Sequence, residues 1–388
     1  MRRNRARALL LATLGFVTAS TFARAEPVGT LTRAEPLGLP PVRIPADNPQ
    51  TDEKVALGHK LFHDKRFSGD GKESCSTCHD DEKAFTDSPL KTSRGIGGQF
   101  GTRNAPTVVN AAYFDSFFWD GRASSLEDQS QFPFLNPVEM GLPTHEPILK
   151  IVRDDPAYNA AFIKVFGVSG ASITMDHVKK AIAAFERTIV SGDSPFDRWY
   201  FGHDNGAISA DAKRGFEIFV GQGRCVSCHT IEQDRALFTD NRFHNIGVGI
   251  NKIQPDVPRL SAEFLNAKAA GASVDNTVLA DPKVSDLGRF AVTTHFDEIG
   301  AFKTSTLRNI AVTGPYMHDG SLKTLRDVVK HYNDGGKSSG DPSINPYLSG
   351  GIRPLNLTEQ QISDLVAFLE TLTSPQYVNA KTKDGATP

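Results

Sequence analysis

Two five-residue stretches, CSTCH at positions 75–79 and CVSCH at positions 225–229, contain all four cysteines of this 388-residue chain. The sequence before each stretch also repeats. ALGHKLFHDKRFSGDGKESCSTCH, from Ala56, and AKRGFEIFVGQGRCVSCH, from Ala212, both combine a short amphipathic segment, a Gly-x-x-apolar-Phe sequence and a polar loop. Self-similarity of this kind is typical of an internal structural repeat. The chain is therefore expected to contain two similar units, each organised around one C-x-x-C-H pentad.

The order of residues within the pentads indicates their chemistry. In C-x-x-C-H, the two thiols form thioethers with the vinyl groups of a haem, and the adjacent histidine binds the iron. Four cysteines in an exported protein could instead form two disulfides, and zinc or thioredoxin-like sites also use C-x-x-C. A histidine at the end of both pentads, with no cysteine left over, favours two covalent haems. The predicted haem-binding residues are Cys75, Cys78, His79, Cys225, Cys228 and His229.

The first 25 residues are predicted to be an export signal. Four arginines precede an apolar run that begins at Ala8, and Ala23-Arg24-Ala25 matches an A-x-A cleavage site. The alternative is a cytosolic protein with a disordered basic tail. We expect Sec-type export and a mature periplasmic protein that begins near Glu26. No membrane span is expected, because no later stretch approaches about 20 apolar residues.

Helical periodicity predicts the fold class. Apolar residues recur at helical spacing in MDHVKKAIAAFERTIV, from Met175, and in LTEQQISDLVAFLETL, from Leu357. Thr358 and Gln361 form a capping box at the start of the second segment. Convincing strand patterns are scarce, and the polar stretch 230–303 is expected to consist of loops with short helices. The predicted fold is mostly α, with two cytochrome c-like domains that each carry one covalent c-type haem.

The segment SGDSPFDRWYFGHDNGAIS, residues 191–209, is rich in Gly, Ser, Asp and Asn, and we expect it to form the domain boundary. The predicted N-terminal domain is 26–195 and the predicted C-terminal domain is 206–380. The net charge of −2 and the 39% apolar content fit a globular protein and give no indication of a nucleic-acid partner.

Two longer motifs carry a resemblance to a known family. RNAPTVVNAAYFDSFFWDGRASSLEDQSQFPFLNPVEM, residues 103–140, resembles the segment between the haems of bacterial dihaem cytochrome c peroxidases and their MauG-like relatives. TLRNIAVTGPYMHDGSLKTLRDVVKHYN, residues 306–333, resembles their C-terminal haem pocket. With both pentads in register, the resemblance covers nearly the whole mature chain. It implies that the first haem, bound by His79, reacts with hydrogen peroxide.

The resemblance also implies the residues on the reactive side of the first haem, which are Gln129, Pro133 and Glu139. Cleavage of the peroxide O–O bond requires a base that takes a proton from one oxygen and returns it to the other. A carboxylate among apolar side chains has a raised pKa that suits this task, and Gln129 can orient peroxide by hydrogen bonding. Pro133 occupies the sixth position without being able to ligate. The alternative for Glu139 is an ordinary surface glutamate.

Trp119 is implied to lie between the two haems as an electron relay, because an indole is oxidisable. The alternative is a core aromatic residue. A calcium ion is also implied between the haems, held by the Asn104 side chain and the carbonyls of Thr313 and Pro315. Oxygen ligands with water suit this hard cation. His318 is expected to hydrogen-bond a haem propionate.

The sixth ligand of the second haem separates branches of the family. In the peroxidase branch, a methionine stands fourteen residues after the histidine of the Pro-Tyr-x-His-Asp-Gly motif. Here that histidine is His318 and the fourteenth residue is Tyr332, as in MauG-like enzymes, while Met317 lies within the motif itself. A phenolate lowers the haem reduction potential, whereas a thioether raises it. The alternative for Tyr332 is a packed helix residue.

Two further departures bear on the branch. Peroxidase members place a histidine over the peroxide site, and the matching position here is Ile96, so the site is expected to be open in the resting ferric enzyme. The quinone-forming MauG-like enzyme has a surface tryptophan two residues before its second pentad, where this chain has Gly223. Trp199, beside Tyr200, is either a replacement electron gate or a packed aromatic residue.

Three functions remain open at this stage. The first is a MauG-like oxidase that uses hydrogen peroxide to reach a bis-ferryl state and oxidises an aromatic residue of a periplasmic protein partner. The second is a cytochrome c peroxidase that reduces peroxide with electrons from a small cytochrome or cupredoxin. The third is a dihaem electron carrier. Tyr332 and Ile96 favour the first function, Gly223 weakens it, and Gln129 with Glu139 opposes the third.

Overall fold

The computed structural model describes residues 35–339, 343 and 345–380, and it is mostly helical, which confirms the expected fold class. In the part of the chain that is described, regular strand is confined to β1 (Phe243–His244) and β2 (Phe302–Lys303), which pair antiparallel. The predicted export signal, residues 1–25, lies outside the described residues. Among the described helices, none combines the length and the apolar character that a membrane crossing requires.

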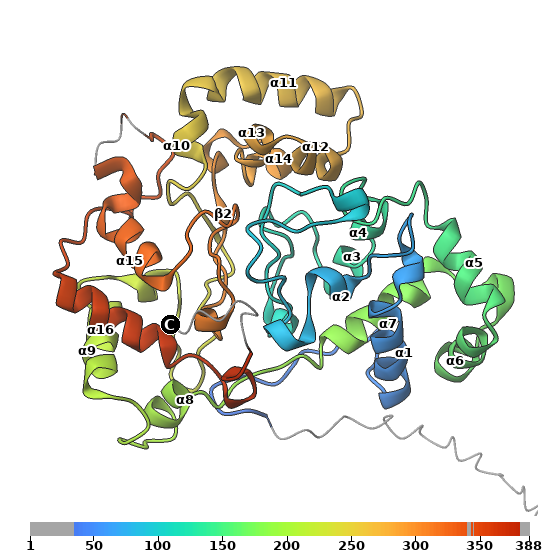
Figure 1. Ribbon diagram of the computed structural model, residues 1–388, viewed down its shortest axis with the longest axis horizontal. Coiled ribbons are helices and arrows are strands. Elements are labelled where there is room, and N and C mark those ends of the chain that lie inside the picture. The colour runs from blue at the N-terminus through green and yellow to red at the C-terminus, as the bar shows by residue number, and fades with distance from the viewer. Residues whose placement is uncertain (1–34, 340–342, 344, 381–388) are drawn as a thin grey trace, which may run out of the picture.

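The first half of the chain packs its helices around one apolar core (Figure 1). The repeat segment forms α1, which buries Leu57, Leu61 and Phe62 against α7. The two helices approach so closely that a Cβ atom on Gly58 would overlap the backbone carbonyl of Ala181. The helices of this half are α1 (Asp52–Phe62), α2 (Cys75–Cys78), α3 (Leu126–Gln129), α4 (Phe132–Leu135), α5 (Glu146–Asp154), α6 (Pro156–Phe166) and α7 (Met175–Glu186).

The second half repeats this packing around a separate apolar core. The second repeat segment forms α9, and a Cβ atom on Gly215 would overlap the carbonyl of Asp364 in α16. The predicted capping box is confirmed, since Thr358 N–H donates to Gln361 Oε1 (2.9 Å) and Gln361 N–H donates to Thr358 Oγ1 (3.3 Å). The helices of this half are α8 (Pro195–Tyr200), α9 (Ala210–Val220), α15 (Leu325–Asn333) and α16 (Glu359–Glu370).

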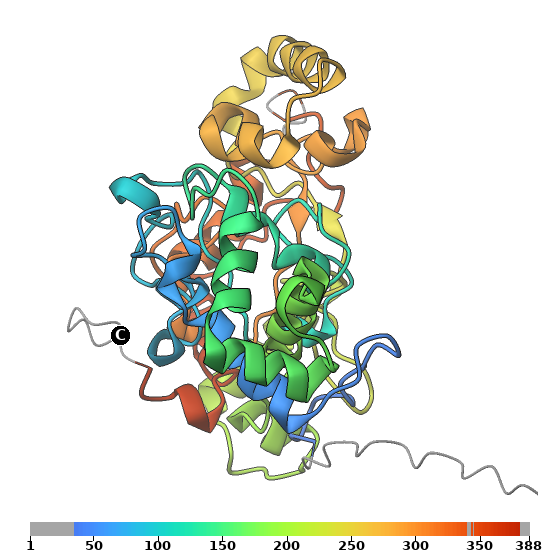
Figure 2. The same cartoon turned by 90° about the vertical axis from the view of Figure 1, so that its right-hand side faces the viewer.

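A third group of helices lies across the top of both halves in Figures 1 and 2. The sequence predicts loops with short helices here, and the helices are present, but they also enclose an apolar core of their own that the sequence reading missed. Val257, Leu260 and Phe264 repeat at helical spacing on the buried side of the longest member. The group comprises α10 (Ile250–Ile253), α11 (Val257–Ala269), α12 (Val274–Ala280), α13 (Pro282–Ser285) and α14 (Phe290–Thr293).

The segment 191–209, expected to be a boundary, is an ordered and partly buried part of the second half. It contains α8, whose Phe196 is completely buried in the second core. Asp197 accepts two hydrogen bonds from the buried guanidinium of Arg308 (2.9 and 3.0 Å). Arg308 also donates to the carbonyl of Gly38 (2.7 Å). This hydrogen bond connects the beginning of the described chain to the second half. In the opposite direction, Tyr377 packs into the first core.

Candidate functional site

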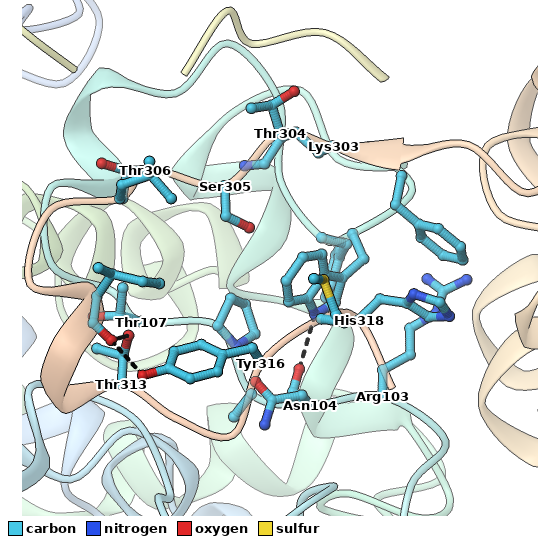
Figure 3. A pocket seen from close by; sticks show the side chains of 18 of the residues that line it. Arg103, Asn104, Thr107, Lys303, Thr304, Ser305, Thr306, Thr313, Tyr316 and His318 are labelled. Carbon is cyan, nitrogen blue, oxygen red and sulfur yellow. Dashed lines mark hydrogen bonds between the residues drawn. The ribbon is translucent and has the colours of Figure 1, made fainter. Parts of the chain in front are cut away.

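Both pentads line one cavity of about 690 Å³ between the two halves. Figure 3 shows part of this cavity, in which Lys303 ends β2, Thr304, Ser305 and Thr306 follow it, and Asn104 of the first half lies opposite them. None of the four cysteines forms a disulfide. The pentad residues that line the cavity are Cys75, Cys78, His79, Cys225, Cys228 and His229.

The two pentad histidines are held in the same way. His79 Nδ1 lies 3.1 Å from the carbonyl oxygen of Phe85, and His229 Nδ1 lies 2.9 Å from that of Phe238. Both phenylalanines have positive φ (57° and 52°), a conformation that is rare for bulky residues and is found at functional sites. A histidine that donates Nδ1–H to a carbonyl keeps Nε2 free for a metal, and burial lowers the pKa of both imidazoles, which keeps them neutral.

The two carbonyl-bearing phenylalanines were not predicted, although a sequence signal exists. Phe85-Thr86-Asp87 and Phe238-Thr239-Asp240 repeat the same three residues shortly after each pentad. Extending the comparison of the two repeats beyond the pentad histidines would have found them.

The cysteine environment fits covalent haem better than the other chemistries considered. Burial raises the pKa of the thiols of Cys78 and Cys225 to about 12, and that of Cys75 in the same direction. Reactive thioredoxin-like cysteines have a lowered pKa, so these thiols are poor thiolate nucleophiles. A buried thiol pair beside a neutral histidine, repeated on the wall of a large cavity, matches the donor set of a c-type haem.

The residues predicted on the reactive side of the first haem line the same cavity. Gln129 ends α3, Pro133 lies in α4, and Glu139 follows α4. Burial raises the pKa of Glu139 to about 7; the negative charge of Asp275 acts in the same direction, and Arg122 opposes both. The position of Asp275 in α12 makes the third helix group part of this site.

The charges around Glu139 are fixed by a buried network. Arg122 contacts Asp120 (3.0 Å) and Asp275 (2.5 Å), and Arg103 contacts Asp120 (2.6 Å). Asp120 is completely buried, and its two guanidinium partners lower its pKa to about 2 despite burial. Arg122 and Asp275, which act in opposite directions on the pKa of Glu139, are thus held together by a direct ion pair.

Ile96, at the position where peroxidase members have a histidine, does not line the cavity. Its side chain packs against Gly69 and Gly141. A Cβ atom added to Gly69 would lie 3.0 Å from Ile96 Cδ1, and one added to Gly141 would lie 2.8 Å from it. The Ile96 N–H donates to the carbonyl of Glu139 (2.8 Å). Ile96 therefore supports the backbone of Glu139, while its neighbour Gly95 lines the cavity.

Trp119 lies in the cavity wall and is fixed at both its ring and its backbone. Its Nε1–H donates to the Asn104 carbonyl (2.9 Å), and its own carbonyl accepts from the Lys303 N–H (2.8 Å). Lys303 was not predicted. Burial lowers the pKa of its ammonium group to about 7, and Nζ donates to the carbonyl of Ser116 (2.8 Å) and lies over the Phe114 ring.

Glu186 is a second residue that the sequence reading missed. It ends α7, is 5% exposed and lines the cavity, and burial raises its pKa to about 8. Among the described atoms, its Oε2 has no hydrogen-bond partner. The signal was available, because Glu186 is four residues after Ile182 and so falls on the apolar face of the predicted helix.

Tyr332, in α15, lines the cavity near the second pentad. Burial raises the pKa of its hydroxyl, and the neighbouring Cys225 and Cys228 act in the same direction. Met317 also lines the cavity. Gly223 leaves little room for a side chain, because a Cβ atom there would lie 2.9 Å from the carbonyl oxygen of Ile218.

The remaining predicted residues have mixed surroundings. Trp199 packs edge-to-face on Phe216 (5.1 Å between ring centroids), as expected for a packed aromatic residue. Asn104, Thr313 and His318 line the cavity, and so does Pro315 (Figure 3 labels the first three). His318 Nε2 lies 2.8 Å from Asp286 Oδ1, which leaves Nδ1 as its remaining polar atom.

Comparison with known proteins defines the family. Residues 52–205 match the family model described as di-haem cytochrome c peroxidase. The chain is 40% identical over 351 residues to the cytochrome-c peroxidase IdrP1 of Denitromonas iodatirespirans (87% of this chain, 86% of that protein). It is 39% identical over 328 residues to the methylamine utilization protein MauG of Methylorubrum extorquens (84% and 80%). A crystal structure of a MauG-like protein associated with microbial copper homeostasis is 32% identical, with a TM-score of 0.71 (89% and 98%).

These similarities, over most of both chains, place the protein in the di-haem cytochrome c peroxidase family, close to its MauG-like members. The protein is an oxidoreductase that uses hydrogen peroxide, and its cofactor is haem. Relatives named as peroxidases and as MauG occur at nearly equal identity. The choice between the two activities therefore depends on the residues of the site.

Proposed function

We propose that this protein is a periplasmic enzyme that uses hydrogen peroxide to oxidise an aromatic residue of a protein partner, as a MauG-like enzyme. The observation that carries the proposal is Tyr332, which lines the cavity beside Cys225 and Cys228 at the position where the peroxidase branch has methionine. The two haems, when bound, supply iron that reacts with peroxide and stores oxidising equivalents. The pentad cysteines would hold the haems covalently, and His79 and His229 would each supply an imidazole nitrogen to an iron.

At the first haem, Glu139 is the proposed acid–base group. A pKa of about 7 makes the carboxylate and the carboxylic acid nearly equally populated at neutral pH. Such a group can accept a proton from one peroxide oxygen and return it to the other, because neither transfer is strongly uphill. Gln129 is proposed to orient the peroxide, and Pro133 leaves the sixth position free. The placement of Ile96 outside the cavity supports a site that is open without prior reduction.

At the second haem, Tyr332 is proposed to bind the iron through its phenolate oxygen. Because burial raises the pKa of the hydroxyl, an ionised Tyr332 requires a cation beside it, and a ferric iron provides that charge. An anionic ligand stabilises the oxidised iron and lowers the reduction potential. Such a haem suits storage of an oxidising equivalent, whereas it is a poor acceptor of electrons from a high-potential cytochrome.

Trp119 is the proposed relay between the two haems. Its indole is fixed by the Asn104 carbonyl, and its backbone is hydrogen-bonded to Lys303, so the ring has little freedom to reorient. We further propose a calcium ion held by Asn104, Thr313 and Pro315, which all line the cavity, and a haem propionate contact through His318 Nδ1.

The division into domains 26–195 and 206–380 is supported by the two separate apolar cores.

The second candidate is a cytochrome c peroxidase. Met317 lines the cavity and carries the thioether that this activity uses at the second haem, and a relative named cytochrome-c peroxidase IdrP1 is 40% identical. The position of Met317 within the His-Asp-Gly turn, fifteen residues before Tyr332, argues against its replacing the expected ligand.

Protein oxidation and cytochrome turnover separate the two activities. The holoenzyme is treated with stoichiometric hydrogen peroxide in the absence of a reductant, and its tryptophan, tyrosine and methionine residues are examined by mass spectrometry. We expect added oxygen on these side chains, a changed pattern in Trp119→Phe, and slow steady-state oxidation of reduced cytochrome c. Rapid oxidation of cytochrome c over many turnovers, with no protein modification, would establish the plain peroxidase instead.

A further inference from the structure

Three side chains with metal-binding atoms meet on the surface of the first half, at a place that the haem chemistry does not use. His59 lies in the last turn of α1, His63 is the residue that caps this helix one turn later, and Asp81 begins the helical turn that follows His79. One ligand atom from each of the three lies within 4.8 Å of the other two. His63 Nε2 and Asp81 Oδ1 are 3.3 Å apart.

This separation fits two ligands of one metal ion. Zinc binds imidazole nitrogen and carboxylate oxygen at about 2.0–2.2 Å, so adjacent ligands in a tetrahedral site lie roughly 3.3–3.5 Å apart. His63 Nδ1 lies 2.8 Å from the His59 carbonyl oxygen, a contact in which the ring donates its proton. Metal-binding histidines use the same arrangement, because it leaves the Nε2 lone pair free. Here that lone pair is directed toward Asp81.

His59 is also prepared for a metal. Its ring packs edge-to-face on Phe185 (5.0 Å) and lies 4.3 Å from the ring of His63. These two ring contacts hold the His59 side chain beside His63, on the side where Asp81 also lies.

The internal repeat provides an independent comparison. Aligning the two repeats on Gly58 and Gly215 matches His59 with Phe216 and His63 with Val220, and aligning the pentads matches Asp81 with Ile231. All three positions are apolar in the second half. Phe216 is covered there by the ring of Trp199, whereas His59 is exposed. The repeated fold therefore does not require polar residues at these three positions. The first half nevertheless has a potential metal ligand at each of them.

We propose that His59, His63 and Asp81 form a binding site for a divalent transition-metal ion such as zinc, with water completing its coordination. Two imidazoles and one carboxylate suit this class of cation, whereas calcium and magnesium prefer oxygen ligands alone. The ion connects α1 to the loop between His79 and Phe85. It therefore braces the segment whose carbonyl orients the first pentad histidine.

The test uses the intact holoprotein, freed of metal by chelator dialysis and titrated with zinc chloride in a calorimeter. We expect one saturable site that is weakened at least about tenfold in His63→Gln and in Asp81→Asn, since even loss of an outer partner of a metal ligand costs that much. His203→Gln removes another exposed histidine and is the matched control, with unchanged affinity expected. Unchanged haem absorption spectra verify that each variant is folded.

Copper(II) provides a second measurement on the same proteins. Its electron paramagnetic resonance signal, recorded on the fully ferric holoprotein, should show coupling to two nitrogens that falls to one in His63→Gln and stays at two in His203→Gln. If zinc does not saturate a site, or binds all four proteins equally, the proposal is wrong. The three residues are then only a polar contact between His63 and Asp81, with the ring of His59 tilted against that of His63.

Discussion

The two halves of the chain place different residues at the same point of a shared framework. Trp119–Gly121 in the first half corresponds to His318–Gly320 in the second, and both turns are preceded by a residue with positive φ, Phe118 (64°) and Met317 (74°). Each turn is closed by an isolated antiparallel bridge and is followed by a helix. The framework around each pentad is thus largely the same, including the phenylalanine carbonyl that fixes the histidine.

The difference appears fourteen residues after the first residue of each turn, where the first half has Pro133 and the second has Tyr332. Proline has no group that can bind iron, whereas tyrosine has one. Beyond Pro133, the first half adds Glu139 with its raised pKa. Under the proposed function, this one exchange at equivalent positions would distinguish an open haem site, where a substrate can enter, from a closed site that holds charge.

The largest expected effect comes from removing Glu139, the proposed base of the open site. Glu139→Gln keeps the size and hydrogen-bonding capacity of the side chain but cannot accept a proton. We expect the rate constant for reaction with hydrogen peroxide to fall by roughly 10²- to 10⁴-fold, the usual contribution of general acid–base catalysis. Stopped-flow absorption measures this rate. Glu146→Gln, which changes an exposed carboxylate of the same half, should have no effect.

The pH dependence tests the same residue without a substitution. Because the pKa of Glu139 is raised to about 7, the carboxylate is the minor form below that pH and the major form above it. The rate should therefore rise about tenfold per pH unit below pH 7 and level off above it, and this rise should be absent in Glu139→Gln. A flat profile in the unmodified enzyme would mean that another group takes the proton.

The next effect concerns the closed site. Tyr332→Met replaces a phenolate with a neutral thioether, which stabilises ferrous iron, so the reduction potential of the second haem should rise on the order of 0.1 V or more. Spectroelectrochemistry measures the potential. Tyr332→Phe, which can supply no ligand, should instead give a second high-spin signal in electron paramagnetic resonance. A low-spin signal that is unchanged in both variants would identify a different ligand.

The smallest expected effect tests the framework itself. Gly58→Ala and Gly215→Ala each place a Cβ atom on a backbone carbonyl of the facing helix, so each helix pair must separate. Overpacking of this kind costs typically 1–3 kcal/mol, which lowers the unfolding temperature by several degrees. Similar losses in the two variants would support equivalent helix packing. Gly206→Ala, whose added Cβ meets only an ordinary 3.4 Å contact, is the control, and a loss as large there would contradict the explanation.

The sequence was informative where chemistry requires a fixed order of residues. The pentads, the Thr358 capping box and the residues Gln129, Pro133 and Glu139 were all located from motifs, and the last three line the cavity together with the pentads. It was less informative where a property depends on distant parts of the chain. Nothing near Glu139 in the sequence indicates that Asp275 raises its pKa, and the apolar core of the third helix group is hidden in a segment that is polar on average.

Asp275 also affects how such an enzyme can change during evolution. It lies on α12, in a helix group inserted between the second pentad and the final helices, yet its charge acts on a carboxyl group of the first half. With Glu139 as the proposed acid–base group, substitutions at Asp275 would shift the pH range of peroxide chemistry while every residue proposed to contact peroxide stays the same. Selection for acidic or alkaline habitats would then leave its record in α12, which is distant in the sequence from the motif 103–140 although Asp275 contacts Arg122 of that motif.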